Sequence, residues 1–340
     1  MVGNAAGCAK RGWPSLAASD ILVGTGGGVA GVMADLLIGL DWGTSACRAY
    51  LMRRDGTVLE TRAGDEGILA VPPGGFAAVL AAKTAGWRAA HGDLPMIASG
   101  MIGSRQGWHE APYVACPAGL AELAAGLLPV DSDGGRLWLV PGVTCRGADG
   151  TPDVVRGEET QLFGCGAATG QRFFVLPGTH SKWMLVEDGR IVRFFTFMTG
   201  EVFGVLTQHS ILGRLMAGDA PDPEAFKAGL ARARRGGPLL HDLFSARTLG
   251  LFDLLPAAGL NSYLSGLLIG SELAGVAGLA AADAGERAVS EATIVAGAAL
   301  ARRYEEALSL FGIAADVAAA DVAARGLARI AAAAGIGAGG

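Results

Sequence analysis

A short apolar run that ends at an aspartate, and resumes after a glycine and two hydroxyl residues, constrains this chain most. Leu36–Leu40 leads into the Asp41–Ser45 segment, and Cys47–Met52 follows as a second, mostly apolar run. Two runs of this length around a glycine-containing break are typical of a β-hairpin. The sequence therefore predicts a hairpin whose turn carries polar side chains.

The turn of this hairpin has the groups that a phosphate and its metal ion need. Gly43 lets the backbone approach a phosphate closely, and the N–H groups and hydroxyls of Thr44 and Ser45 can donate to its oxygens. Asp41 can bind Mg²⁺, usually through water, because this ion prefers hard oxygen ligands and keeps much of its hydration shell. An ordinary tight turn would explain the same residues, so this motif alone leaves both interpretations open.

The same pattern returns about 135 residues later, which predicts a structural duplication and not a short-period solenoid. Arg172–Leu176 is predicted as a strand, Gly178–Lys182 as a loop with glycine and hydroxyl residues, and Trp183–Val186 as the next strand. A third strand is predicted after each hairpin, at Thr57–Arg62 and at Ile191–Phe195. Each copy thus predicts a mixed sheet that begins as an antiparallel meander.

The remaining segments alternate between apolar runs and helical patterns. The predicted elements are a helix at Phe76–Ala90, strands at Pro95–Gly100 and Leu137–Val143, a helix at Glu158–Ala168, mostly helical sequence from Val202 onward, and a late strand from Ala292 that enters a tight turn at Gly297. Ligands tend to lie at the carboxyl ends of strands in α/β sheets. The polar loop after Gly100 is therefore a candidate for part of a binding site.

Composition places the chain among globular proteins. Its 340 residues suffice for two domains, with 51% hydrophobic and 17% charged residues. A net charge of −5 and a pI near 5.6 argue against a nucleic-acid surface. The five scattered cysteines form no CxxC pair, which favours reduced thiols and a cytoplasmic location. The chain contains no run of 18 apolar residues that is free of glycine and charge, so the sequence predicts no transmembrane helix.

Residues 1–35 imitate a signal peptide. Lys10 and Arg11 precede an apolar stretch, but several glycines interrupt that stretch and the predicted hairpin begins at once. We interpret this segment as an N-terminal extension, for which Met33 would be a natural start of the folded chain.

Three motifs in a fixed order give the chain a wider resemblance. Asp41–Ser45 matches the first phosphate motif of the actin, sugar kinase and Hsp70 ATPases, Gly178–Lys182 lies where their second belongs, and Val295–Ala299 matches their adenosine motif. The chain resembles this superfamily, which implies an α/β fold of two actin-like (ribonuclease H-like) lobes, with duplicated mixed sheets and flanking helices. The implied lobes are a sugar-binding and phosphate lobe at 36–155 and a nucleotide-binding lobe at 156–340.

The same resemblance implies ATP and Mg²⁺ as cofactors. The residues that it assigns to ATP and its metal are Asp41, Gly43, Thr44, Ser45, Gly178, Thr179, Ser181, Lys182, Gly297 and Ala298.

Further segments narrow the resemblance to one family. They are Ser99–Ser104, Arg156–Gly164, Leu176–Trp183, Thr199–Glu201 with His209–Leu212, and Ala298–Tyr304. These segments are similar to the 2-dehydro-3-deoxygalactonokinase family over roughly residues 36–330. The resemblance implies ATP-dependent phosphorylation of 2-dehydro-3-deoxy-D-galactonate to its 6-phosphate, in galactonate catabolism.

A reaction of this kind needs a base, because a primary alcohol is a poor nucleophile at neutral pH. Asp153 precedes the predicted interdomain helix, where related sugar kinases keep a catalytic aspartate, and the resemblance favours it as the base. Glu158 is the alternative, although acidic residues such as Glu158 and Glu159 also stabilise the first turn of a helix. Arg156 could bind the substrate carboxylate, bind the transferring phosphoryl group, or form a surface ion pair.

The sugar acid carries a carboxylate and hydroxyls. Arginine can hold a carboxylate through two parallel hydrogen bonds. Arg105, with Ser104 beside it, is the first candidate for this contact, because both lie in the loop after the Pro95–Gly100 strand. Thr199 and Glu201 are candidates for contacts with sugar hydroxyls.

Two other functions stay open on the sequence alone. One is a kinase of another sugar or sugar acid with the same fold, and the other is an ATP-binding regulator or chaperone-like ATPase. The expected partners are a small sugar acid and ATP, with no nucleic acid and no membrane, and a homodimer is left open.

Overall fold

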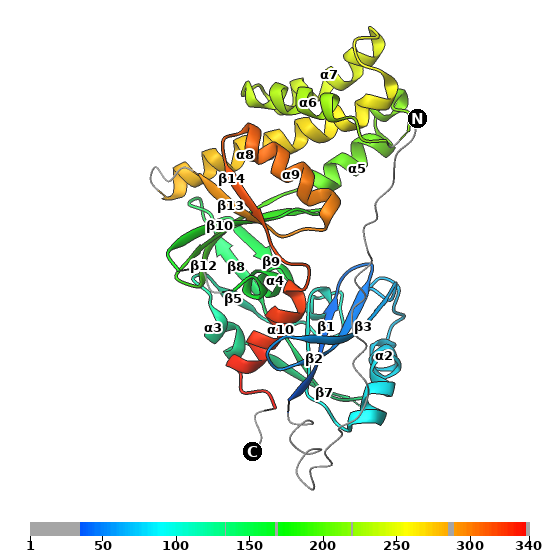
Figure 1. Cartoon of the computed structure of the whole chain (residues 1–340), viewed down its shortest axis with the longest axis vertical. Coiled ribbons are helices and arrows are strands. Elements are labelled where there is room, and N and C mark those ends of the chain that lie inside the picture. Colours follow the sequence, from blue (N-terminus) through cyan, green and yellow to red (C-terminus); the bar gives the residue numbers. More distant parts are fainter. Residues whose placement is uncertain (1–34, 133, 167–168, 219, 285–288, 338–340) are drawn as a thin grey trace, which may run out of the picture.

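The computed structural model of the chain describes residues 35–132, 134–166, 169–218, 220–284 and 289–337. Apart from Asp35, the expected N-terminal extension lies outside the described residues. Figure 1 shows one sheet at one end of the long axis, a second sheet near the middle, and helices α6 and α7 at the opposite end.

The first sheet is built on the predicted first hairpin. Its strand order is β3-β2-β1-β4-β7-β6. The strands are β1 Leu36–Trp42, β2 Cys47–Arg53, β3 Val58–Gly64, β4 Met96–Ser99, β6 Leu128–Ser132 and β7 Gly135–Leu139. β1 is antiparallel to β2 and parallel to β4, so it lies at the point where a meander meets parallel strands. Every side chain of Leu36–Leu40 is buried, as a continuous apolar run in a central strand predicts.

The second sheet repeats this plan. Its strand order is β12-β11-β10-β13-β14. The strands are β10 Gln171–Leu176, β11 Ser181–Glu187, β12 Arg190–Phe197, β13 Glu291–Ile294 and β14 Ala314–Val317. Three antiparallel strands are again followed by parallel ones. The shared order of the two sheets confirms the predicted duplication and the mixed sheets of an actin-like fold.

A small third sheet, in the order β5-β8-β9, was not predicted. It consists of β5 Tyr113–Ala115, β8 Gly142–Arg146 and β9 Pro152–Val155. The predicted single strand Leu137–Val143 is wrong, because β7 ends at Leu139 and β8 begins at Gly142 in another sheet. The break falls at Val140 and Pro141, and a proline supplies no N–H for a strand ladder.

Helices cover the sheets and separate them. They are α2 Phe76–His91, α3 Leu120–Ala125, α4 Glu158–Gly164, α5 Thr199–His209, α6 Pro223–Arg234, α7 Leu239–Leu251, α8 Leu260–Ala284, α9 Ala298–Leu310 and α10 Val322–Ala333, with 3₁₀ turns η1 Met101–Gly103, η2 Gly213–Leu215 and η3 Ala257–Gly259. The predicted helix Glu158–Ala168 is too long, because α4 ends at Gly164. Within the described residues, one stretch, Ala257–Ala280, is long and apolar enough to cross a membrane, but 67% of its most apolar window is buried inside the protein.

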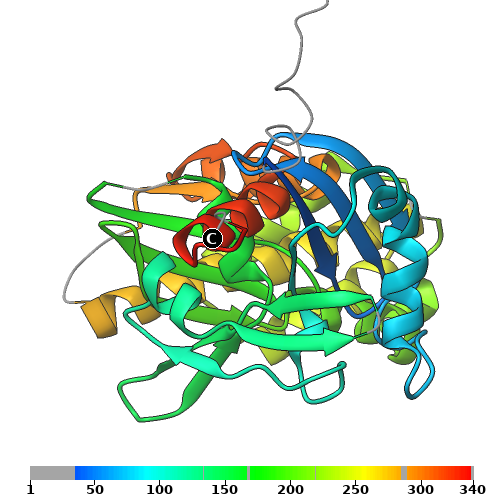
Figure 2. The same cartoon turned by 90° about the horizontal axis from the view of Figure 1, so that it is seen from below.

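Helices α4 and α10 pack directly against each other between the two sheets (Figures 1 and 2). Two glycines allow this close approach, because a Cβ on Gly164 would lie 1.8 Å from the Val322 carbonyl oxygen and one on Gly326 1.8 Å from that of Thr160. Although α10 is near the end of the chain, it also contacts β1 and β4 of the first sheet. The division into lobes at 155 and 156 stays a prediction, with α10 contributing to the packing of the first sheet.

Candidate active site

The first hairpin presents Asp41 at the end of β1. Its register partners are Arg48 on β2 and Ser99 at the end of β4, so the carboxylate lies at the carboxyl edge of two parallel strands. The turn is closed by the Gly43 N–H, which donates to the Ala46 carbonyl at 2.9 Å, and it exposes Thr44 and Ser45. The structure therefore presents the predicted phosphate-binding groups at the sheet edge where ligands usually bind.

The environment of Asp41 favours a positively charged ligand. Burial raises the pKa of Asp41, the charge of Glu158 raises it further, and Arg48 lowers it. The nearest oxygen of Asp41 lies 3.7 Å from the Arg48 guanidinium. A carboxylate that is poorly solvated and faces a second carboxylate gains most from a bound cation.

The second hairpin brings a loop and a helix together. Gly178, Thr179 and His180 are exposed, whereas Ser181 and Lys182 are buried at the start of β11. Helix α5 begins beside this loop, since the Glu201 N–H donates to the Thr179 carbonyl at 2.9 Å.

Glu158 lies between the two hairpins. Its Oε1 atom is 3.4 Å from Nζ of Lys182, and its Oε2 atom accepts a hydrogen bond from the Arg156 N–H at 3.0 Å. It is also close enough to Asp41 to raise the pKa of that residue. The structure thus brings together three of the predicted site residues, one from each hairpin and one from the segment between the lobes.

Glu159, the next residue, is fully buried. Burial, followed by the charge of Glu158, raises the pKa of Glu159 to about 7. Its carboxylate accepts hydrogen bonds from the Gly157 N–H at 2.7 Å and from the Thr160 hydroxyl at 3.0 Å. Glu159 therefore holds the turn that precedes α4, and Glu158 alone of the two faces the hairpins.

Asp153 has a different setting from Glu158. One of its oxygens accepts from the Thr196 hydroxyl at 2.7 Å and from the Val154 N–H at 2.8 Å, and the other accepts from the Thr196 N–H at 2.8 Å. The two bonds from Thr196 join β9 to β12. A carboxylate has about four acceptor sites, so these three donors leave Asp153 little capacity to accept the substrate hydroxyl, and its role as the base stays a prediction.

Each residue predicted to bind the sugar acid contacts a different protein group. The Ser104 hydroxyl donates to the Met101 carbonyl at 2.7 Å, and the Arg105 side chain is 86% exposed. The Thr199 hydroxyl donates to Glu272, and Glu201 lies 2.5 Å from Nε2 of His180. Arg105 itself lies 3.4 Å from Glu110, so each of these polar groups already has a protein partner, and their predicted roles toward the sugar stay predictions.

The predicted adenosine motif forms the start of α9. Gly297 caps the helix, and Gly297 and Ala298 are exposed. A cavity of about 460 Å³ lies beside this helix, between α5 and the start of α8. Its lining includes Phe203, Thr207, Gln208, Asn261, Ser262 and Arg303.

Comparison with known protein families identifies one family within this superfamily. The family described as 2-keto-3-deoxy-galactonokinase matches residues 41–330. The chain belongs to this family. The match covers the turn and second strand of the first hairpin, the whole second hairpin, α4 and the adenosine motif, and so confirms the resemblance that the sequence motifs indicated.

Individual relatives agree with the family. The chain is 38% identical over 237 residues to the 2-dehydro-3-deoxygalactonokinase of Escherichia coli (strain K12), a match covering 70% of this chain and 79% of the relative. It is 40% identical over 243 residues to a probable 2-dehydro-3-deoxygalactonokinase of Rhizobium meliloti (strain 1021), covering 69% and 78%. The crystal structure of a candidate 2-dehydro-3-deoxygalactonokinase from Sinorhizobium meliloti superposes with a TM-score of 0.78 at 37% identity, covering 88% of this chain and 98% of that one.

A buried polar network behind the second hairpin was not predicted. Glu272 of α8 accepts hydrogen bonds from Ser181, Trp183, Thr199 and Tyr304. Burial raises the pKa of Glu272, and burial together with the charge of Glu272 raises that of Tyr304. The Glu272 carboxylate thus links β11 of the second hairpin to the first residue of α5 and to α9.

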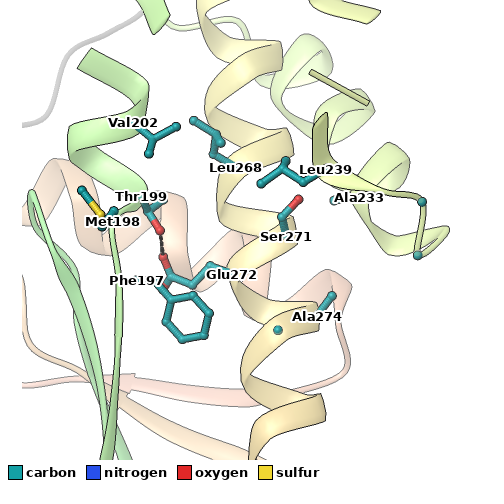
Figure 3. Close-up of a pocket in the computed structure, with 13 residues that line it drawn as sticks. Phe197, Met198, Thr199, Val202, Ala233, Leu239, Leu268, Ser271, Glu272 and Ala274 are labelled. Carbon is teal, nitrogen blue, oxygen red and sulfur yellow. Dashed lines mark hydrogen bonds between the residues drawn. The ribbon is translucent and has the colours of Figure 1, made fainter. Parts of the chain in front are cut away.

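The sequence does contain a signal for this network. Between Leu260 and Ala282, Glu272 is the only charged residue of an apolar helix. A lone carboxylate in such a segment is expected to be buried with hydrogen-bond partners. Figure 3 shows Glu272 and Thr199 side by side at the wall of an outer cavity of about 470 Å³, which Val202, Leu239 and Leu268 also line.

Proposed function

We propose that this chain transfers the γ-phosphoryl group of ATP to the C6 hydroxyl of 2-dehydro-3-deoxy-D-galactonate. The position of Glu158 between Asp41 of the first hairpin and Lys182 of the second carries this proposal. A phosphoryl group held by two phosphate loops must react at the point where they converge, and Glu158 provides a carboxylate there. Membership of the 2-keto-3-deoxy-galactonokinase family supports the choice of substrate.

Each residue then has a separate task. Glu158 accepts the proton of the C6 hydroxyl as the new O–P bond forms and the bond to the leaving ADP oxygen breaks. Lys182, whose ammonium group is buried, neutralises charge on the transferring phosphoryl group. The exposed N–H and hydroxyl groups of Thr44, Ser45 and Thr179 donate to phosphate oxygens.

The residues present fit a hydrated Mg²⁺ ion. Among the described residues, no group of three His, Cys, Asp or Glu side chains could enclose a metal, which suits an ion held by one carboxylate, water and phosphate oxygens. Asp41 would hold it, since burial and Glu158 both raise the pKa of this carboxyl and a nearby cation would favour its ionised form. The ion would supply positive charge that offsets the charge of the ATP phosphates.

We infer that the purine binds in the cavity of about 460 Å³ beside α9, which Arg303 lines. The turn at Gly297 and Ala298, where the helix begins, is exposed, and a Cβ on Gly297 would meet no atom within 4 Å. Arg303 is on the same helix and donates to the Ser265 hydroxyl at 3.2 Å, which fixes one wall of the cavity. A cytoplasmic location and a homodimer remain predictions from the sequence.

The first test is a coupled assay of ADP formation with the full chain and a panel of sugars and sugar acids. Turnover dependent on 2-dehydro-3-deoxy-D-galactonate, with phosphate on C6 of the product, is expected. ADP formation that no sugar acid increases would instead support the ATPase alternative.

Two matched amide variants test the base. Glu158→Gln should lower kcat by roughly 10²- to 10⁴-fold, because general-base catalysis typically contributes that much. Asp153→Asn should keep most of the turnover, since the side chain links β9 to β12 through Thr196. Near-normal turnover in Glu158→Gln combined with loss in Asp153→Asn would return the role to Asp153.

A further inference from the structure

Arg156 directly follows β9 and lies on the same turn as Glu158. The intervening Gly157 has φ +111°, and a Cβ there would lie 3.2 Å from Cα of Gly100, the residue after β4. The Arg156 N–H donates to Glu158, so the backbone of one residue helps to orient the side chain of the other. Arg156 and the proposed base therefore belong to one ordered turn.

The guanidinium of Arg156 is buried and only partly satisfied. The residue is 8% exposed, and its Nη2 donates to the Ala111 carbonyl at 2.9 Å. The Tyr113 ring lies 4.3 Å from Cζ. Its Nε and Nη1 atoms have no hydrogen-bond partner among the described residues, and no described acidic side chain forms an ion pair with it.

A buried cation without a counter-ion is costly, because burial removes its hydration and one carbonyl and one aromatic ring replace only part of it. The side chain is nevertheless fixed by one carbonyl and one aromatic ring, so it cannot turn freely toward solvent. Gly103 lies next to Nη1, since a Cβ on this glycine would be 3.0 Å away from that nitrogen. The arrangement is what a preorganised anion site requires: fixed donors, low solvation and a neighbour without a side chain.

We propose that Arg156 binds the carboxylate of the sugar acid and thereby sets the preference for acids over neutral sugars. This inference rests on the proposed kinase activity. Of the roles that the sequence left open for Arg156, carboxylate binding is supported by its contacts with Gly103 and Ala111, which lie in and just after the loop that was predicted to bind the sugar acid. Arg105, the first candidate, is 86% exposed and lies 3.4 Å from Glu110, so it already has a counter-ion in solvent.

The test uses Arg156→Met, with Arg105→Met as the matched control, and two ligands: the sugar acid and its methyl ester. Charge-assisted hydrogen bonds are typically strong enough that Arg156→Met should raise KM for the acid by about 10- to 100-fold. KM for ATP should stay within about twofold of the wild-type value. The wild-type enzyme and Arg105→Met should prefer the acid to the ester, whereas Arg156→Met should not.

The possible outcomes separate this inference from the proposed function. If the wild-type chain does not phosphorylate the sugar acid, the proposed function fails. If it does, but Arg156→Met keeps its preference for the acid while Arg105→Met loses it, the assignment to Arg156 is overturned. Should Arg156→Met be unfolded by circular dichroism, Arg156→Lys keeps the charge without the planar fork, and an unchanged preference for the acid together with an unchanged KM would likewise overturn it.

Discussion

The two hairpins have the same strand order but distribute their charges differently. In the first hairpin, Asp41 has its cation, Arg48, on the neighbouring strand, 3.7 Å away. In the second, Lys182 is 5% exposed and lies opposite Leu176, so its own hairpin supplies no carboxylate at that position. Its ionic partner is Glu158, which belongs to the segment that enters α4.

This difference shows how a duplicated fold becomes an asymmetric site. A hairpin that carries a carboxylate suits a metal ion, and one that carries a buried ammonium suits the phosphate itself. Because Lys182 pairs with Glu158, the second hairpin also positions the proposed base. The first hairpin is expected to act through its metal, and the second through charge and orientation.

The largest effect is expected when the Asp41 carboxylate of the first hairpin is replaced by a neutral group. Asp41→Asn should lower kcat/KM by about 100- to 1,000-fold at low Mg²⁺, because metal stabilisation of a phosphoryl transition state contributes several kcal/mol. Raising Mg²⁺ should restore part of the activity. Asp35→Asn is the control, since Asp35 pairs with Arg53 just before the same strand. An unchanged Mg²⁺ dependence in Asp41→Asn would remove Asp41 from the metal site.

Neutralising the second hairpin should have a smaller effect. Lys182→Met should lower kcat/KM by about 10- to 100-fold, the range expected for losing a charge-assisted hydrogen bond. The corresponding change in the first hairpin, Arg48→Met, removes a cation whose side chain is 58% exposed and should change kcat/KM by less than about threefold. Equal losses in the two variants would mean that the two cations do not differ in function.

The sequence predicted the hairpins well because their signals are local. Apolar runs, a glycine break and a turn lie within a few residues, and each sheet begins with them. The third sheet was missed since β5 spans only three residues and β8 follows a proline, so neither has a clear alternating pattern.

The base illustrates a different difficulty. Asp153 and Glu158 are five residues apart, one shortly before α4 and the other at its first residue, so sequence order does not decide between them. What separates them is their non-local partners: Thr196, 43 residues away, binds Asp153, and Lys182 of the second hairpin approaches Glu158. The unpartnered nitrogens of Arg156 are likewise a property of packing, which no local pattern reports.

A final comparison concerns Glu158 and Glu159, of which only the first faces the hairpins. Glu159→Gln should have the smallest effect of these changes on catalysis, and it should instead change how stability depends on pH. Burial raises the pKa of Glu159 to about 7 from an ordinary value of 4.5, so the folded chain binds this proton more tightly than the unfolded chain. The stabilisation is complete below the ordinary value and is lost as the pH rises through about 7, with an upper limit of about 3 kcal/mol.

Glutamine cannot ionise, so Glu159→Gln should remove this contribution to the pH dependence of the free energy of unfolding. The measurement is urea unfolding of the full chain between pH 4.5 and pH 8, with the wild type and Glu224→Gln as references. Glu224 has an 85% exposed side chain, so its amide variant should keep the wild-type slope. If Glu159→Gln also keeps that slope, Glu159 is ionised in the folded chain across this range, and its burial does not distinguish it from Glu158.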